Sequence, residues 1–133
     1  MGDPKFIQKA VSSGGRATVA NVAADGTGTY ATIAVCDNPV GLRIDSVHFK
    51  ALATTAANKL RIFLQEPDSG PTRLIHEIAV TAVTMSNTAA SWASIWVPDP
   101  PLVLQEGYTL KFAPANALAA GFDATVTSGG ELD

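Results

Sequence analysis

Two histidines, one cysteine and a few neighbouring carboxylates are the residues of this chain whose types could do chemistry. A cupin-type metal site needs a close histidine pair, a third histidine and a carboxylate, and the chain has only His48 and His76. His76-Glu77 begins like the HExxH zinc motif, but Val80 stands where the second histidine is required. The sequence therefore predicts neither a metal site nor a cofactor.

Nucleophilic and acid–base catalysis also lack a recognisable motif. Cys36 lies within an apolar run, which favours a buried free thiol, and no serine occupies a Gly-x-Ser-x-Gly elbow. Glu66 and Asp68 are the nearest carboxylate pair, yet they fall in a Pro/Gly turn, where solvated charge is normal. A carboxylate pair for glycoside cleavage stays open on sequence alone, but we expect that the protein is not an enzyme.

The run Asp25-Gly26-Thr27-Gly28 has the glycines of a phosphate-binding loop. Such a loop cradles phosphate where a helix follows it. A strand is expected at residues 29–36 instead, so the glycines predict the turn of a hairpin between strands at residues 16–22 and 29–36.

Trp92 and Trp96 are the most informative aromatic residues. Four positions apart in a strand, they point to the same face, roughly 13 Å from each other. We favour the interpretation that both fill the core between two sheets; the alternative is a sugar platform or an interface anchor. If both face inward, Ala93, Ile95 and Val97 face outward, and this second face is itself apolar. One of the two faces is therefore predicted to be an interface.

Short apolar or alternating runs separated by turn residues predict the elements that position these side chains. Turn signals recur at intervals of roughly 10 to 15 residues, which is typical of a two-sheet sandwich or a barrel. We predict an all-β fold, an antiparallel β-sandwich of about eight strands with a jelly-roll-like order. The expected strands cover residues 16–22, 29–36, 42–53, 59–65, 73–81, 91–97, 102–104, 108–112 and 122–127.

Three of these runs carry finer predictions. The apolar parity of residues 42–53 switches between Ile44 and Val47, which predicts a bulge or bend. Residues 59–65 alternate cleanly except for Phe63, which falls on the polar face. Residues 73–81 are predicted to place four side chains on one side of their strand: Leu74, His76, Ile78 and Val80.

Length and composition predict one domain with an N-terminal extension. The chain has 133 residues, of which 47% are apolar and 16% charged, with a net charge of −3, values typical of a globular domain. We assign residues 15–133 to the sandwich and residues 1–14 to an extended arm. The apolar residues Phe6 and Ile7 are expected to pack this arm on its own domain or, as we favour, on a neighbouring subunit.

Charge and hydropathy exclude two classes of partner. The nine basic residues are scattered rather than gathered in the patch that nucleic-acid binding requires. No apolar stretch is as long as a membrane span, and residues 1–6 lack the apolar run of a signal peptide. We therefore expect no nucleic-acid or membrane partner, and a protein made in a reducing cytoplasm.

From residue 41 onward, a pattern of strands and turns recurs that covers roughly two-thirds of the chain. Its segments are residues 60–64 and the turn after them, residues 74–80 with the Ala/Thr/Ser loop after them, residues 102–110 and residues 122–130. This pattern resembles small β-sandwich virion structural proteins of tailed bacteriophages, of the capsid decoration or cement type. The resemblance implies no catalytic residues.

The leading functional hypothesis is a capsid decoration or cement protein on the phage head, assembled in the host cytoplasm. It would be a homo-oligomer, preferably a trimer, whose partner is the major capsid protein or another virion protein. A tail or head–tail accessory protein of similar fold is the alternative. A third hypothesis is a carbohydrate- or receptor-binding module, which would need exposed, coplanar aromatics among Trp92, Trp96, Tyr30 and Tyr108. The candidate interface residues are Phe6, Ile7, Trp92, Ile95 and Trp96.

Overall fold

The computed structural model describes residues 7–10, as backbone only, and residues 13–132. Every regular element within these ranges is a β-strand. The described residues therefore include no helix long and apolar enough to cross a membrane. The strands are β1 (Ile7–Ala10), β2 (Gly14–Ala17), β3 (Ala31–Val35), β4 (Leu42–Ala51), β5 (Asn58–Gln65), β6 (Thr72–Val80), β7 (Ala93–Trp96), β8 (Leu102–Leu104), β9 (Thr109–Pro114) and β10 (Phe122–Leu132).

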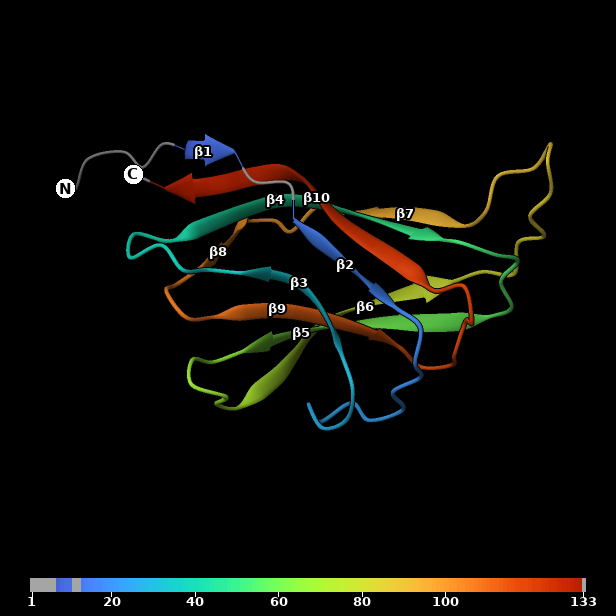
Figure 1. Cartoon of the computed structure of the whole chain (residues 1–133), viewed down its shortest axis with the longest axis horizontal. Helices are drawn as coiled ribbons and strands as arrows, with labels where there is room; N and C mark the ends of the chain where they lie inside the picture. Colours follow the sequence, from blue (N-terminus) through green and yellow to red (C-terminus); the bar gives the residue numbers. More distant parts are fainter. Residues whose placement is uncertain (1–6, 11–12, 133) are drawn as a thin grey trace.

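The strands form two antiparallel sheets that pack against each other (Figure 1). The larger sheet has the order β1-β10-β4-β7, with β2 also paired to β10 and β8 also paired to β4. The smaller sheet has the order β3-β9-β5-β6. The predicted all-β antiparallel sandwich is confirmed.

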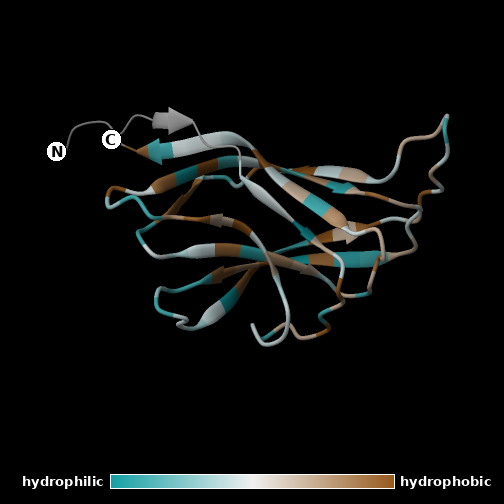
Figure 2. Cartoon of the chain, viewed as in Figure 1, coloured by the Kyte–Doolittle hydropathy of each residue, from teal (hydrophilic) through white to brown (hydrophobic). Residues whose placement is uncertain are grey.

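The core lies between the sheets and is built from the alternate side chains of their long strands. Figure 2 shows the alternation of hydrophobic and hydrophilic residues along these strands. Phe49 of β4 and Phe112 of β9 meet edge to face at its centre, with ring centroids 5.6 Å apart. The largest fully buried side chains are Phe49, Phe63, Phe112, Phe122, Ile33, Ile44, Leu60, Ile62, Leu104 and Leu110, with Val47 and Val126.

Register shifts in two of the strand pairs, β4–β10 and β5–β6, bear on the predicted directions of side chains. In the β4–β10 pair, Val47 lies opposite Val126 but Ile44 lies opposite Gly129, with shifts on both sides of the pair Ser46–Ser128. The bulge predicted between Ile44 and Val47 is thus confirmed.

The second shift is in β6, and it corrects a prediction. His76 lies opposite Ile62, whereas Leu74 lies opposite Phe63, so Ile75 has no partner on β5. His76 and Ile78 therefore share the inward side of Ile62 and Leu60, while Leu74 points the other way. The predicted single face of residues 74–80 is wrong because one inserted residue reverses the alternation.

The hairpin predicted around Gly26 is also wrong. β2 ends at Ala17 in the larger sheet, β3 begins at Ala31 in the smaller sheet, and residues 18–30 cross between them without a ladder. Asn21 organises this crossing: its Nδ2 donates to the carbonyls of Thr27 and Thr29, both at 3.0 Å, and its Oδ1 accepts from the Ala23 N–H at 3.0 Å. A side chain thus supplies hydrogen bonds that a hairpin ladder would otherwise provide.

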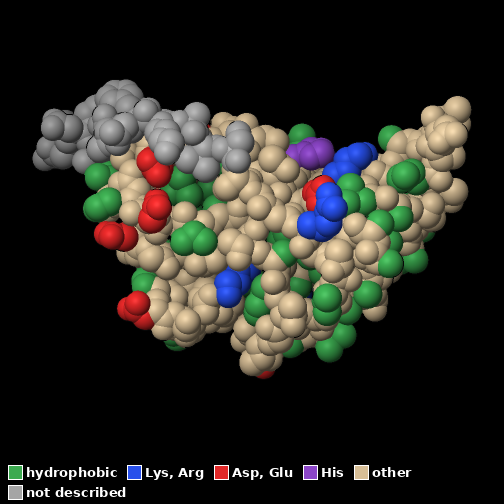
Figure 3. All heavy atoms as spheres, in the orientation of Figure 1, with side chains coloured by type: hydrophobic (Ala, Val, Ile, Leu, Met, Phe, Trp, Pro, Cys, Tyr) green, Lys and Arg blue, Asp and Glu red, His purple; other side chains and the backbone are tan. Residues whose placement is uncertain are grey.

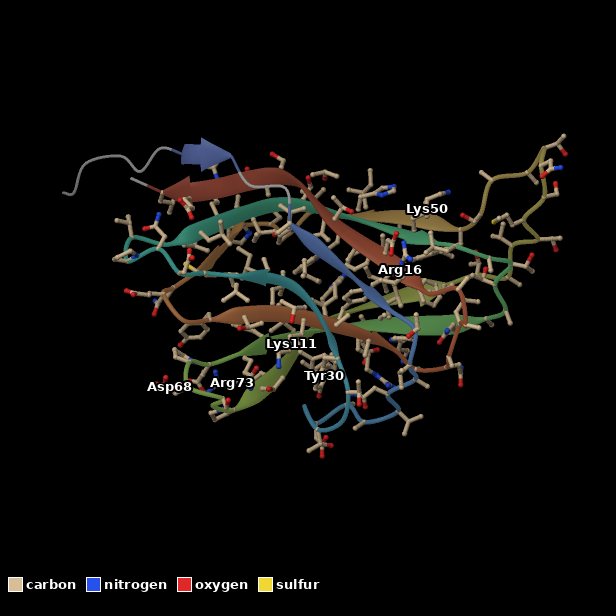
Figure 4. All side chains as sticks on the ribbon, in the orientation of Figure 1. Arg16, Tyr30, Lys50, Asp68, Arg73 and Lys111 are labelled. Atoms are coloured by element: carbon tan, nitrogen blue, oxygen red, sulfur yellow. The ribbon has the colours of Figure 1, made fainter. Side chains whose placement is uncertain are left out.

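The crossing segment also explains Phe63. This ring lies on the outer face of the smaller sheet, yet it is fully buried, because Tyr30 packs on it edge to face at 4.8 Å. Lys111 lies beside Tyr30 (Figure 4), with its Nζ 5.5 Å from the ring centroid. Arg61 donates to the Val22 carbonyl at 3.3 Å. Residues 18–30 therefore cover part of a face that would otherwise be exposed.

Part of the predicted N-terminal arm lies within the described residues. Ile7–Ala10 forms β1, which pairs antiparallel with β10 of the same chain, Ile7 opposite Leu132 and Ala10 opposite Gly130. This stretch of backbone rests on its own domain. Phe6 and the side chain of Ile7 lie outside the described residues, so their predicted role at an interface stays a prediction.

Candidate functional site

One long side of the sandwich is closed by backbone. β2 pairs with β10 and also lies against β3 of the smaller sheet. Its glycines allow this approach, since a Cβ on Gly14 would overlap the carbonyl of Ala124 and a Cβ on Gly15 would overlap the carbonyl of Thr32. We call this the closed side.

The opposite long side, which we call the open side, carries β6 and β7. Each of them pairs with one strand only among the described residues. The two edges meet through His76 and Trp96, whose rings stack at 12° with centroids 5.2 Å apart. Side chains alone thus cover this border of the core.

Both tryptophans lie at the open side, with their rings against the core. Trp92 is 7% exposed and meets the Phe122 ring edge to face at 6.0 Å. Its carbonyl accepts a hydrogen bond of 2.9 Å from the Ala51 N–H, which fixes it at the end of β4. Trp96 is partly buried against the same core. The interpretation that both tryptophans face the core is confirmed, and they do not form an exposed coplanar platform.

The residues between and beside the tryptophans face outward, as expected for that arrangement. Ile95 is 62% exposed and Val97 64%. β8 continues along the same side of β4 and adds Val103, which is 46% exposed. We call Ala93, Ile95, Val97 and Val103 the apolar edge. Large side chains exposed in a group are typical of interaction surfaces.

The segment that contains most of the apolar edge has no charged residue over a long stretch of sequence, although Lys50 and Arg43 of β4 lie opposite Ala93 and Val103. From residue 78 to residue 98 the chain has no Asp, Glu, Lys, Arg or His. This stretch includes the end of β6, the loop that projects beyond the sheets between β6 and β7 (Figure 1) and β7 itself. Met85 in the loop is 45% exposed. The sequence predicted the outward apolar face of residues 93–97, but not that the uncharged segment extends through the loop before β7, because the search was for reactive residues rather than for the absence of charged ones.

Charged side chains on the remaining surface stand mostly in pairs. Figure 3 shows Lys and Arg side chains in small separate groups on the visible face. Arg16 and Asp123 form one pair at 2.7 Å on the outer face of the larger sheet. Arg73 and Glu66 form another at 3.0 Å beside the β5–β6 turn, the end of the molecule where Figure 4 also places Asp68.

The residues considered for chemistry are dispersed. His48 lies on β4 opposite Ile95, and His76 on β6 in the other sheet. Burial raises the pKa of the Cys36 thiol, which is 1% exposed and donates to the Asn38 carbonyl at 3.4 Å, so the reactive thiolate is disfavoured. Within residues 13–132, no three His, Cys, Asp or Glu side chains are grouped to hold a metal ion.

Comparisons with known proteins add no relative. No family model, no curated protein and no solved structure matches this chain. The apolar edge and the uncharged segment of chain that contains most of it are therefore the features that bear on function.

Proposed function

We propose that this chain is a non-enzymatic structural protein that binds another protein through the apolar edge. In its most specific form it is a capsid decoration or cement protein on the head of a phage. The observation that carries the proposal is the exposure of Ile95 and Val97 in a stretch of the chain, residues 78–98, that has no charged residue. Interface cores are depleted of charged residues, because burying an unpaired charge is costly.

The order of the strands supports the same proposal. We infer a jelly-roll connectivity, since β2-β10-β4-β7 faces β3-β9-β5-β6 and successive strands pass repeatedly from one sheet to the other. Jelly rolls are common among viral capsid and lectin domains. The partner would be the major capsid protein or another virion protein, and the protein would act as a homo-oligomer, preferably a trimer, on the virion.

Two other functions use the same fold. A tail or head–tail accessory protein would bind through the same edge to a different virion partner. A carbohydrate- or receptor-binding module is favoured by no observation, since Trp92 lies in the core, His76 stacks on Trp96, and Tyr30 packs on Phe63.

The proposal is tested by binding to expanded capsids of the source phage prepared without this protein. We expect wild type to co-sediment with them and the double variant Ile95→Asp/Val97→Asp to bind at least about tenfold more weakly, because its carboxylates would be desolvated in the interface. Thr32→Asp is the matched control, an exposed strand residue of the smaller sheet, and should bind as wild type does.

Two results would count against the proposal. One is a wild-type protein that does not bind the capsids. The other is a double variant, folded by circular dichroism, that binds as tightly as wild type. Binding to isolated tails but not to capsids would favour the accessory role.

A further inference from the structure

The backbone of β7 has a row of hydrogen-bonding groups with no strand beside it among the described residues. The Trp92 carbonyl accepts a bond of 2.9 Å from the Ala51 N–H, so the backbone of Trp92 faces β4. The β4–β7 register has no shift, and backbone groups alternate in direction along a strand. The N–H and C=O groups of Ala93, Ile95 and Val97 therefore point away from β4, along the edge of the larger sheet.

β7 lacks two of the features by which natural proteins protect the edge of a sheet. The other edge strand of the open side, β6, has a register shift that skips Ile75, and it carries the exposed charges Arg73 and Glu77. Bulges and charged side chains of this kind prevent pairing between sheet edges. β7 has a regular register with β4 and no charged residue. Its short length is its remaining protection and limits any pairing to residues 93–97.

We propose that β7 pairs antiparallel with β7 of a second copy, about a two-fold axis at Ile95. Ile95 then lies opposite Ile95 of the partner subunit, and Ala93 lies opposite Val97 of the partner subunit. All the residues with outward backbone groups form bonded pairs, and each pair exchanges both of its hydrogen bonds. The larger sheet continues across both copies, as in recognition by strand addition, and the interface is isologous.

The two ends of the unpaired stretch select the axis at Ile95. Before the stretch, the Ser91 carbonyl already accepts a hydrogen bond of 3.4 Å from a lysine side chain. After it, a proline without an N–H precedes the charged Asp99. An axis one residue earlier would set Val97 opposite Ser91 of the partner subunit, and an axis one residue later would set Ala93 opposite Asp99 of the partner subunit. The axis at Ile95 avoids both mismatches.

The same pairing covers part of the apolar edge. Ile95 is 62% exposed and Val97 64%. Directly opposed side chains lie about 5 Å apart on one face of a sheet, and apolar pairs of this kind stabilise it. Ile95 would contact Ile95 of the partner subunit, and Ala93 would contact Val97 of the partner subunit. The outward sides of these residues then form one patch from two copies, which deepens the proposed function because the virion partner would face both.

The distribution of charge along the molecule favours the antiparallel arrangement. The loops at one end of the sandwich carry several carboxylates and no basic residue; the carboxylates are those of Asp37, Glu66, Asp68 and Glu106. The loops at the other end, residues 52–57, 81–92 and 115–121, have no charged residue. In the antiparallel pair the acidic loops of the two copies lie at opposite ends of the dimer, each on the side where the partner subunit presents its uncharged loops. Like charges are thereby kept apart, beyond the range of screened repulsion.

A proline at the axis tests the pairing in the full chain. At about 100 μM, which populates any dimer with a micromolar dissociation constant, wild type should scatter light with twice the mass of the 13.7 kDa chain. Ile95→Pro removes an N–H that points away from β4, a position where a strand tolerates proline, and should be monomeric. Ile95→Val, the control, keeps the N–H and an apolar side chain and should remain dimeric. Near-UV circular dichroism confirms that each variant folds.

Cysteine variants test the register. Directly opposed residues of antiparallel strands have Cβ atoms about 5 Å apart, within disulfide reach. Ile95→Cys should therefore form a covalent dimer on mild oxidation, while the buried Cys36 does not react. Ala93→Cys alone and Val97→Cys alone should stay reduced, because their equivalent positions lie about 13 Å apart in the dimer. An equimolar mixture of these two variants should cross-link.

Any of three results would overturn the pairing. They are a wild-type protein that stays monomeric at that concentration, an Ile95→Pro variant as dimeric as wild type, and a mixture of Ala93→Cys and Val97→Cys that does not cross-link. A trimer would also reject the two-fold axis, whereas a dimer would replace the trimer preferred above. Since no capsid enters these experiments, the pairing can fail while capsid binding holds, and the reverse.

Discussion

The closed and open sides of the sandwich protect the same core by different means. On the closed side a strand with two glycines brings backbone against backbone, with Gly15 beside the Thr32 carbonyl. On the open side two edges approach each other only through the His76 and Trp96 rings. Where backbone lies against backbone, on the closed side, there is no room for added atoms. Where only side chains meet, on the open side, substitutions are better tolerated and the strand edges remain able to pair. The first side is therefore expected to govern stability, and the second to govern association.

Among substitutions at the borders of the core, the largest loss of stability should come from filling the closed side. Gly15→Val places side-chain atoms where the Thr32 carbonyl oxygen lies, so β2 must move away from β3. We expect a loss of about 3 kcal/mol in the free energy of unfolding, measured in urea. Alkylation of Cys36, which follows β3 and is buried in the wild type, should become faster as that side opens.

Arg16→Ala is the control for this substitution. It changes the neighbouring residue of β2, whose exposed side chain points outward to Asp123, and should leave the free energy of unfolding nearly unchanged, because exposed ion pairs contribute little to stability. Equal stabilities of Gly15→Val and Arg16→Ala would show that β2 does not close the core.

A smaller loss in the free energy of unfolding is expected from a substitution on the open side. Trp96→Ala removes a partly buried ring and its stacking on His76, and should cost about 1–2 kcal/mol. Trp92→Ala, the control in the same segment, removes a core ring and should cost about 3–5 kcal/mol. Chemical denaturation of the two variants measures the contrast, and a Trp96 variant as unstable as the Trp92 variant would contradict the distinction between core and border.

The smallest expected effect is a pH-dependent change in stability caused by Glu77 on β6, at the open side. A hydrogen bond from Lys59, with help from Arg61, holds the pKa of Glu77 below its ordinary value of 4.5. A lowered folded-state pKa means that the contribution is fully present above the ordinary value and is lost as the pH falls through the folded value. The stability difference between wild type and Glu77→Gln should therefore persist at neutral pH and vanish under acidic conditions. Thermal melts of the two proteins across the acidic range measure it; a difference that grows with acidification would contradict it.

The sequence was sufficient to predict the two-sheet architecture and the inward positions of the tryptophans. Both follow from period-two alternation, which is a local property. The bulge in β4 was predictable for the same reason, because a change of parity is visible between Ile44 and Val47. The skipped Ile75 left no such trace, because Leu74, Ile78 and Val80 keep the same parity on the two sides of it.

The other errors in the predicted strands involve glycines and Asn21. Gly26 and Gly28 were interpreted as hairpin residues, but the conformation of their segment depends on the buried side chain of Asn21. The last strand was expected to end at residue 127, yet β10 continues through Gly129 and Gly130 to Leu132. There the missing Cβ is what allows Gly129 to lie against the Arg43 carbonyl. The role of a glycine depends on what it touches, which alternation does not report.

The pairing of Ile7 with Leu132 also makes a circular permutation of the chain feasible. Since β1 and the end of β10 lie together at one end of the sandwich (Figure 1), a short linker can join Leu132 to Ile7. New termini can then be opened in the exposed loop around Asn87, at the other end of the molecule. Such a circular permutant keeps every strand pair, and a peptide fused to its new ends would be displayed next to the uncharged surface instead of far from it.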